Sequence, residues 1–449
     1  MMPDLDVAVV GAGMAGLTAA DELARSGLSV RVFETGEQVG GRMAGFRHRG
    51  YTVDTGAEQI SPSGYRATWE LLARLGFRDR DVPRLGGRIS VWRGRRARPG
   101  VAEARGMLTG AGLGLRGRAD LARFQAWARR HRHLFDGDHP ETSPLGTTTL
   151  AELGGRYHRD LHDYLLQPVA GTFFGWDPQR SAAAPMVSLL LDVGDASRWR
   201  TYRGGMDTAA RMLAARLDVR TGQTVRQVVS GTGSAQLLTD AGAVSARAVL
   251  LCVPAPVAAR LHANPTEQEA RYLAAATFHP AVKVSCLLHR PLAPRGGKST
   301  YVLLTPAVAD GALSAIIFDH RKHPDRAPAG AGLLTLMPAR AATASMLDRA
   351  DSDVAGTLTA AAERYLPGLA GATWRTFVHR FPHGLPEATP AVLRQRAGFA
   401  ARPTGPVDFA GDWVLQRPSS EAAVRSGALA ASRTRAHLSS RAAVPVRVR

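Results

Sequence analysis

The chain has 449 residues, of which 45% are hydrophobic and 21% charged, a composition ordinary for a globular protein with a large core. Its net charge of +19 comes from basic residues that are spread along the chain and form no stripe on a nucleic-acid-binding module, so no nucleic-acid partner is predicted. The two cysteines, Cys252 and Cys286, supply neither a disulfide framework nor a metal site, which favours a reducing compartment and a cytoplasmic location.

Membrane signals are sparse in this sequence. No uninterrupted apolar stretch reaches the ~18 residues that a membrane-spanning helix needs, and the short basic segment 441–449 does not resemble a tail anchor. Segment 118–135 predicts a basic amphipathic helix, with apolar residues at Leu121, Phe124 and Ala128. Core packing of its apolar face is favoured, and weak association with a membrane surface stays open as the alternative. The sequence carries no signal for an oligomeric state.

The first 34 residues predict a strand, a glycine turn, a helix and a second strand. Apolar residues 7–10 lead into Gly11-Ala12-Gly13-Met14-Ala15-Gly16, a helix-compatible run covers 14–26, and 28–33 reads as a second buried strand. Gly27 lies between helix and strand, where a helix C-cap belongs. This is the G-x-G-x-x-G fingerprint of a dinucleotide-binding βαβ unit in its required context.

Each position of the fingerprint has a predicted role. Gly11 permits the tight turn, Gly13 lets the backbone approach a pyrophosphate, and Gly16 lets the helix pack on the strand. Ala15 lies in the first helical turn, whose free N–H groups and partial positive charge face the pyrophosphate. Glu34, eighteen residues after Gly16, is placed to accept hydrogen bonds from an adenosine ribose. The segment therefore predicts an ADP-containing dinucleotide.

The next motif is Gly40-Gly41-Arg42-Met43, where paired glycines precede an arginine that can bind phosphate bidentately. The spacing from the glycine fingerprint through Glu34 to this motif resembles the flavin-dependent amine oxidase superfamily. That superfamily includes monoamine and polyamine oxidases, protoporphyrinogen oxidase-like proteins and carotenoid desaturases. The resemblance implies FAD, with Glu34 on the ribose and Gly41 and Arg42 near the pyrophosphate.

Segment 51–60 resembles the strand and turn that lie beneath the isoalloxazine ring in that family, with Gly56 and Ala57 in the turn. Small residues there suit close approach to a flat ring. Glu58 follows directly and is predicted to point toward the ring edge or the substrate cavity. A carboxylate in this position can orient a cationic substrate or move a proton; a surface or salt-bridged glutamate is the alternative, and both stay open.

Distant segments complete the family's cofactor site. By resemblance, Val225 lies against the adenine, and Asp412 after Gly411 bonds the ribityl chain or the pyrophosphate. The helix that contains Ala423 points its N-terminus at the flavin, where reduced flavin gains negative charge. Since no cysteine lies in this region, the FAD is expected to be non-covalent.

Lys283 is the most unusual residue of segment 278–288, which is otherwise an apolar strand. Burying an ammonium group is costly unless it has a partner. The segment resembles the amine oxidase strand whose lysine holds a water against flavin N5, which implies that Lys283 assists the reaction with O2. An outward-pointing lysine on a half-exposed strand is the alternative.

Three further features are weaker. Phe174 and Trp413 are candidate substrate residues, although aromatic side chains in such runs more often belong to the core. Segment 319–326 is rich in His, Arg and Asp, but it lacks the regular spacing of metal ligands. It is therefore predicted to be a solvated loop without a metal.

The predicted fold class is α/β: a Rossmann-like FAD-binding domain of the two-dinucleotide-binding-domain type, with an inserted α+β substrate domain. The FAD domain is assigned to 1–84, 203–275 and 401–440, and the substrate domain to 85–202 and 276–400. The predicted activity is two-electron oxidation of a C–N bond in a small molecule, from amine or amide-type nitrogen to imine, with O2 reduced to H2O2. A C–C dehydrogenase like the protoporphyrinogen oxidase or phytoene desaturase branches is the alternative, and a flavin-bound scaffold without catalysis is a third.

Overall fold

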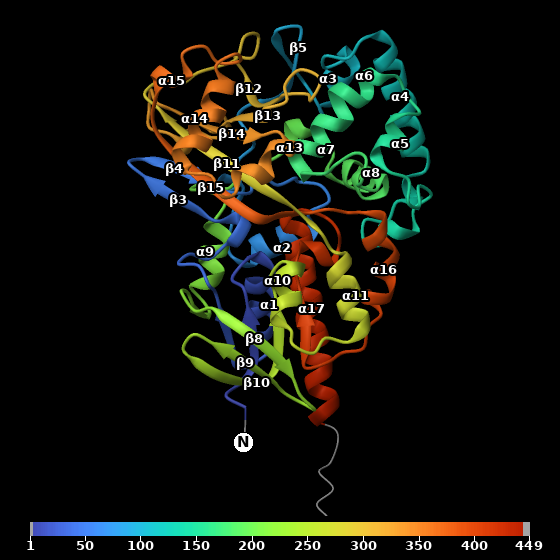
Figure 1. The fold of residues 1–449 in the computed structure, drawn as a ribbon, viewed down its shortest axis with the longest axis vertical. Helices are drawn as coiled ribbons and strands as arrows, with labels where there is room; N and C mark the ends of the chain where they lie inside the picture. The colour runs from blue at the N-terminus through green and yellow to red at the C-terminus, as the bar shows by residue number, and fades with distance from the viewer. Residues whose placement is uncertain (1–2, 443–449) are drawn as a thin grey trace, which may run out of the picture.

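The computed structural model describes residues 3–442, so most of the basic segment 441–449 lies outside it. Two seven-stranded sheets form the framework of the described chain. Figure 1 shows them in opposite halves of an elongated molecule, with the first sheet in the lower half and the second in the upper half. The architecture is α/β, as predicted.

The first sheet has the strand order β7-β2-β1-β10-β9-β8, and β16 pairs with β10. Strands β2, β10 and β16 run parallel to their neighbours in the centre, whereas β8, β9 and β10 form an antiparallel extension. The central strand β1 is almost entirely buried, which is typical of a parallel sheet covered on both faces. The strands are β1 (Leu5–Val10), β2 (Val30–Phe33), β7 (Asp218–Arg220), β8 (Val225–Ser230), β9 (Ala235–Thr239), β10 (Gly242–Leu251) and β16 (Val407–Phe409).

The predicted βαβ unit is confirmed in its type and nearly in its bounds. Helix α1 (Met14–Ala24) begins at the predicted residue and ends two residues early, and Gly27 has the left-handed φ of +83° that suits a helix C-terminus. Figure 1 shows α1 beside α17 (Ser420–Ala442), so the first and last helices of the described chain lie together. The other helices of this half are α2 (Arg66–Arg74), α9 (Thr208–Ala214), α10 (Ala255–Leu261), α11 (Glu267–Ala275) and α16 (Pro390–Ala400).

The second sheet has the order β15-β11-β14-β13-β12-β5-β6 and is mixed, because β12 and β5 are parallel while their other neighbours are antiparallel. Its strands are β5 (Arg88–Arg93), β6 (Arg96–Pro99), β11 (Phe278–Leu288), β12 (Thr300–Leu304), β13 (Leu313–Phe318), β14 (Gly332–Pro338) and β15 (Thr373–Pro386). The proposed domain boundaries keep both sheets whole. A separate hairpin of β3 (Gly45–His48) and β4 (Tyr51–Asp54) lies between the halves.

Helices flank the second sheet on two sides (Figure 1). Those on one side are α3 (Ala104–Thr109), α4 (Leu115–Arg130), α5 (Leu150–Gly154), α6 (Arg159–Leu161), α7 (Gln167–Phe174) and α8 (Ala183–Val193). Helices α12 (Asp319–Lys322), α13 (Arg340–Thr343), α14 (Asp351–Ala362) and α15 (Leu369–Ala372) also contact strands of this sheet.

Helix α4 confirms the predicted amphipathic helix and ends at Arg130. Its apolar residues Leu121, Phe124 and Ala128 are buried in the core of this half. The apolar face is therefore satisfied by core packing, and its basic side faces outward. Within residues 3–442, none of the helices combines the length and apolar character needed to cross a bilayer.

The prediction for segment 319–326 is wrong. The segment forms helix α12 followed by a short 3-10 helix, η7 (Pro324–Arg326), rather than a solvated loop. Asp319, Lys322 and Arg326 are between 0% and 2% exposed. Their burial depends on partners from distant segments, which local sequence patterns do not reveal.

Candidate cofactor and active site

A cavity of about 430 Å³ opens where β1 and β2 end, which is where open α/β sheets bind their ligands. Gly11, Glu34 and Val225 all line it, so three residues predicted to surround an adenosine meet in space. The cavity is large enough for a nucleoside. Its other walls include Phe33, Val253, Val257, Arg260 and Leu261.

The Glu34 carboxylate is held by backbone groups at this cavity. Oε2 accepts a hydrogen bond from the N–H of Ala12 at 2.7 Å, and Oε1 accepts one from the N–H of Gly36 at 2.8 Å. A carboxylate has about four lone-pair sites, so these two bonds leave acceptor capacity for ribose hydroxyls. The geometry fits the predicted ribose contact.

A larger residue would have a different effect at each of the three fingerprint glycines. Gly11 has φ +102°, and a Cβ there would lie 2.8 Å from the carbonyl oxygen of Cys252. A Cβ on Gly16 would clash with the carbonyl oxygen of Gly11, so this glycine is needed for helix–strand packing, as its predicted role requires. A Cβ on Gly13, by contrast, would meet no protein atom within 4 Å.

The open space at Gly13 lies at the N-terminus of α1, where no side chain caps the helix and no acidic residue occupies the first turn. Such a terminus offers N–H donors and a partial positive charge to an anion. Ala15 is buried in this first turn. The residues present therefore fit the pyrophosphate of a dinucleotide.

Arg42 and Asp412 form a bidentate ion pair, with Nη1–Oδ2 and Nη2–Oδ1 distances of 2.7 Å each. Nη1 of Arg42 also donates to the carbonyl oxygen of Gly384 at 3.0 Å. Gly41, with φ +53°, lies against Gly13. Two residues predicted to contact the same cofactor thus contact each other, and they join the N-terminal and C-terminal segments at the α1 terminus.

The Gly56–Ala57 turn is anchored by the same region. The N–H of Ala57 donates to the carbonyl oxygen of Arg42 at 2.8 Å, and a Cβ on Gly56 would clash with that oxygen. The backbone of Arg42 alone therefore demands glycine at position 56. The carbonyl oxygen of Gly56 in turn accepts a hydrogen bond from Lys283 Nζ at 2.8 Å.

Lys283 points inward from β11, and its side chain is only 4% exposed. The alternative of an outward-pointing lysine is therefore wrong. Its ammonium group donates both to the Gly56 carbonyl and to Oε1 of Glu58. The ion pair with Glu58 supplies the partner that a buried ammonium requires.

Glu58 is salt-bridged on both oxygens. Oε1 bonds to Lys283, and Oε2 lies 2.5 Å from Nζ of Lys322. Lys322 is fully buried and also contacts two further carboxylates, Asp54 at 2.6 Å and Asp319 at 3.3 Å. Of the two alternatives for Glu58, the structure shows the salt-bridged one.

Lys322 was missed by the sequence analysis, although a signal existed. The chain contains three lysines, Lys283, Lys298 and Lys322, and two of them lie in this cluster. Lys283 could be recognised because it interrupts an apolar strand. Lys322 has charged neighbours in the sequence, and a charged segment predicts exposure rather than burial.

The charged cluster extends to Arg326, whose Nε lies 3.2 Å from Asp54 and whose Nη2 donates to Thr201 at 2.9 Å. Burial opposes the ionisation of Asp54, but the positive charges of Lys322 and Arg326 outweigh it and lower its pKa. The same carboxylates overcome the effect of burial on Lys322 and raise its pKa. Both groups are therefore charged at neutral pH.

Asp319 has the opposite tendency. Burial raises its pKa to about 7, and repulsion from Glu58 adds to this, while Lys322 acts in the other direction. Its Oδ2 accepts a hydrogen bond from the Thr335 hydroxyl at 2.8 Å. The pKa of Asp319 therefore lies near neutral pH.

The remaining predicted residues have packing partners. The Trp413 indole is fully buried and donates to the carbonyl oxygen of Val253 at 3.0 Å. Phe174 is 7% exposed and packs against Trp176. The N–H of Ala423 donates to the carbonyl oxygen of Ser419 at 3.2 Å, in the first turns of α17.

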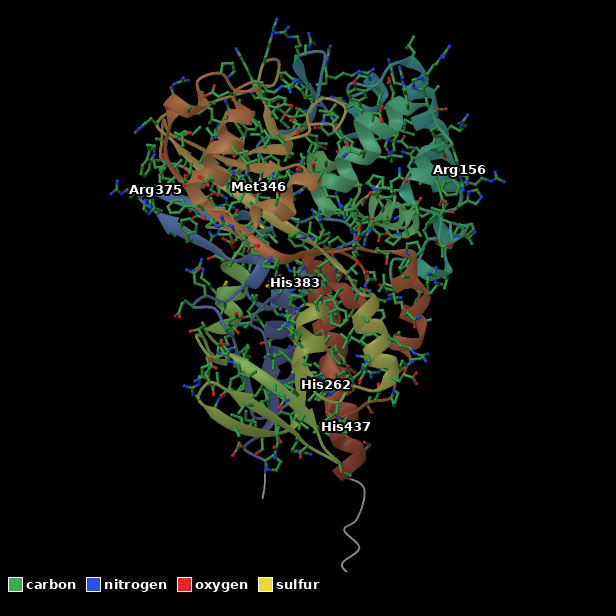
Figure 2. The ribbon with its side chains drawn as sticks, viewed as in Figure 1. Arg156, His262, Met346, Arg375, His383 and His437 are labelled. Atoms are coloured by element: carbon green, nitrogen blue, oxygen red, sulfur yellow. The ribbon has the colours of Figure 1, made fainter. Side chains whose placement is uncertain are left out.

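The cluster lies at the junction between the two sheets. Asp54 is the last residue of β4, and Glu58 lies in the segment after it. Lys283 belongs to β11, and Lys322 belongs to α12, which directly follows β13. Figure 2 labels His383 at this junction, close to the start of α17, and the neighbouring Gly384 is the residue that binds Arg42. Within residues 3–442, no group of His, Cys, Asp and Glu side chains is arranged to hold a metal ion.

Comparisons with known proteins agree with this arrangement. AofH of Mycobacterium tuberculosis, a protein assigned to the flavin-containing monoamine oxidases, is 29% identical over 276 residues, which are 56% of this chain and 57% of AofH. The match thus spans little more than half the length of that relative. Among solved structures, cyclohexylamine oxidase from Brevibacterium oxydans has a TM-score of 0.78 at 17% identity and covers 97% of this chain and 100% of its own.

A protein from Exiguobacterium assigned as a protoporphyrinogen oxidase superposes with a TM-score of 0.72 at 18% identity, covering 98% of this chain and 100% of its own. At these identities the structures establish the fold. The model of one family, described as flavin-containing amine oxidoreductases, matches residues 14–434, which include the charged cluster and every described strand except β1. The chain therefore belongs to the flavin-containing amine oxidoreductases.

Proposed function

We propose that the chain is an FAD-dependent oxidase that converts a C–N single bond of a small molecule into an imine and reduces O2 to H2O2. In the balanced reaction, the substrate loses two electrons and two protons, and O2 gains both to become H2O2. A bound flavin supplies the electron acceptor that links these two halves. The chain's own residues bind it, exclude water and hold charge near the reacting atoms.

The observation that carries this proposal is the position of Lys283. Its buried ammonium group bonds to the carbonyl of Gly56, in the turn that is expected beneath the flavin ring. A preorganised cation in a water-poor site stabilises negative charge that develops during reduction of O2. Glu58 keeps this cation compensated and in place.

The cofactor assignment rests on the adenosine cavity, the open space at Gly13 and the Arg42–Asp412 pair. Non-covalent binding is supported by the two cysteines, because a thiolate is the reactive form of cysteine. Burial raises the pKa of both thiols, that of Cys286 to about 12. We assign 1–84, 203–275 and 401–440 to the FAD domain because its sheet is drawn from these segments.

A second candidate is a C–C dehydrogenase, and the pairing of Glu58 favours it. Both oxygens of this carboxylate are taken by lysines, so it offers no free negative charge to an ammonium substrate. A neutral or apolar substrate suits such a site better than a polyamine does. An amine oxidase reading therefore requires a substrate recognised as the neutral amine or amide.

The test begins with the purified protein, which is expected to be yellow and to release FAD on heating. Peroxide formation is then measured across a panel of neutral amines, amides, polyamines and a tetrapyrrole, with products identified by mass. Imine-derived carbonyl products together with peroxide support the C–N oxidase. A desaturated carbon product without amine turnover replaces it with the second candidate, and a colourless protein that cannot be reconstituted with FAD rejects both.

A further inference from the structure

We propose that Lys322 is a positioning residue that acts through Glu58 to hold Lys283, and that the two lysines work as a pair. The effect of the pair on the reaction with O2 rests on the proposed function. The arrangement itself is a chain of contacts from Lys322 to Glu58 to Lys283 to the Gly56 carbonyl.

The Glu58 carboxylate bridges the two lysines. Lys283 and Lys322 bond to different oxygens of Glu58, so rotation of the carboxylate that favours one lysine disturbs the other. The Glu58 side chain is 11% exposed, and the lysine side chains are 4% and 0% exposed. Water is therefore a poor substitute for either ammonium group.

The donors of Lys322 match the acceptors around it in number. An ammonium group has three N–H donors and no acceptor. Three carboxylates, those of Asp54, Glu58 and Asp319, lie within 3.3 Å of its nitrogen. A planar guanidinium directs its donors in a fixed fork and does not reproduce this arrangement. The site is thus built for lysine specifically.

Lys322 lies on a helix that is tied to the second sheet. Asp319 and Lys322 lie on the same short helix, α12, and Asp319 is tied to Thr335 of β14 by a hydrogen bond of 2.8 Å. Strand β14 pairs directly with β11, which carries Lys283. Lys283 therefore projects from this sheet and Lys322 from a helix tied to it, while Glu58 comes from the segment after β4. Lys322 holds Glu58 against that sheet at a fixed place.

The experiment uses the low lysine content. The protein is produced with lysine labelled with ¹³C at the ε carbon and loaded with flavin. Its NMR spectrum then contains three lysine side-chain signals for the whole chain. Exposed Lys298 serves as an internal reference. We expect Lys322→Arg, which keeps the positive charge, to move the Lys283 signal and leave the Lys298 signal in place. Reoxidation by O2 is expected to slow by roughly tenfold or more, as for other small misplacements of a reacting group.

The role of Glu58 is tested by repeating the substitution in a Glu58→Gln background. There, Lys322→Arg is expected to leave the Lys283 signal unchanged, because the bridge is already broken. An unchanged Lys283 signal in folded Lys322→Arg overturns the proposal, as does an equal shift in both backgrounds. Lys298→Met is the matched control and is expected to alter neither Lys283 nor reoxidation.

Glu58→Gln alone provides a second route if Lys322→Arg does not fold. It keeps the side-chain shape and must move the signals of both Lys283 and Lys322; movement of only one rejects the bridge. These signals are read without substrate. A failure of the peroxide panel with coupled lysine signals rejects the proposed function alone, whereas uncoupled signals with peroxide formation reject the positioning role alone.

Discussion

Arg42 and Asp412 are 370 residues apart in the sequence, yet they form two parallel hydrogen bonds of 2.7 Å each. The pair connects the turn after the first βαβ unit with the start of the C-terminal segment. Both residues were expected to contact the cofactor. Their mutual pairing means that the cofactor site is closed only when the two ends of the described chain have come together.

Arg42→Lys is expected to weaken FAD binding by roughly tenfold or more, because an ammonium group cannot form a bidentate pair with the Asp412 carboxylate. The contact with the Gly384 carbonyl would be weakened as well. Affinity is measured by titrating the flavin-free protein with FAD and following flavin fluorescence. Arg25→Lys, at an exposed position on α1's C-terminal side, is the control; an equal loss in both variants contradicts a specific role of Arg42.

Lys283→Met is expected to slow the reaction of the reduced enzyme with O2 by about 10²-fold, since a preorganised charge of this kind contributes on that scale. Reduction by substrate should change much less. Stopped-flow measurement of the two half-reactions separates them. The idea fails if Lys283→Met reoxidises as fast as Lys298→Met, which removes an exposed lysine.

Gly13→Ala and Gly16→Ala separate cofactor binding from folding. A methyl group at position 13 meets open space, so the flavin-free protein should lose no more than about 1 kcal/mol, the usual cost of alanine at a helix N-cap. Its FAD affinity should fall by tenfold or more. At position 16 the methyl group clashes with Gly11 backbone, so overpacking should cost the flavin-free protein about 1–3 kcal/mol.

Thermal unfolding of both flavin-free variants, together with FAD titrations, checks this contrast. Normal FAD affinity in Gly13→Ala would show that the open space is not used by the pyrophosphate. Equal stability of the two variants would contradict the packing role of Gly16.

Asp319→Asn is expected to change the pH dependence of stability. The pKa of Asp319 is raised from its ordinary value of 3.8 to about 7, so the folded protein binds the proton more tightly than the unfolded chain does. Between these two pH values, stability contributed by this group falls as pH rises. Asparagine does not titrate, so the stability of the variant relative to the wild type should increase from pH 4 to pH 7.

Denaturant unfolding at pH 4.5 and pH 7.5 measures this difference. Asp348→Asn, which changes an exposed aspartate, is expected to show little pH-dependent difference from the wild type. A relative stability of Asp319→Asn that stays flat or declines over this range would place the titrating group elsewhere in the cluster.

The sequence predicted the βαβ unit well because its signals are local. A left-handed residue at Gly27, the glycine turn and a continuous apolar strand act within a few residues of one another. Helix α4 was predictable for the same reason. The bounds differed by only a few residues, as helix ends depend on their caps.

Segment 319–326 was predicted wrongly because its structure is not local. Helix α12 has four residues, too few for a hydrophobic period to show. Its charged residues are stable in the interior only because Asp54 and Glu58 arrive from more than 250 positions away. Without those partners the same residues belong on a surface, which is what their composition indicates.

The flavin-binding fold and the need of Lys283 for a partner could be inferred from short motifs, because strand, turn and helix signals act over a few residues and burying an ammonium group in an apolar strand is costly. The identity of that partner, the pairing of Glu58 with two lysines and the place of Lys322 came from the folded chain alone. Buried charges are stabilised by whichever opposite charges lie within a few ångströms. That proximity is set by how the two sheets pack, and no local pattern in the sequence records it.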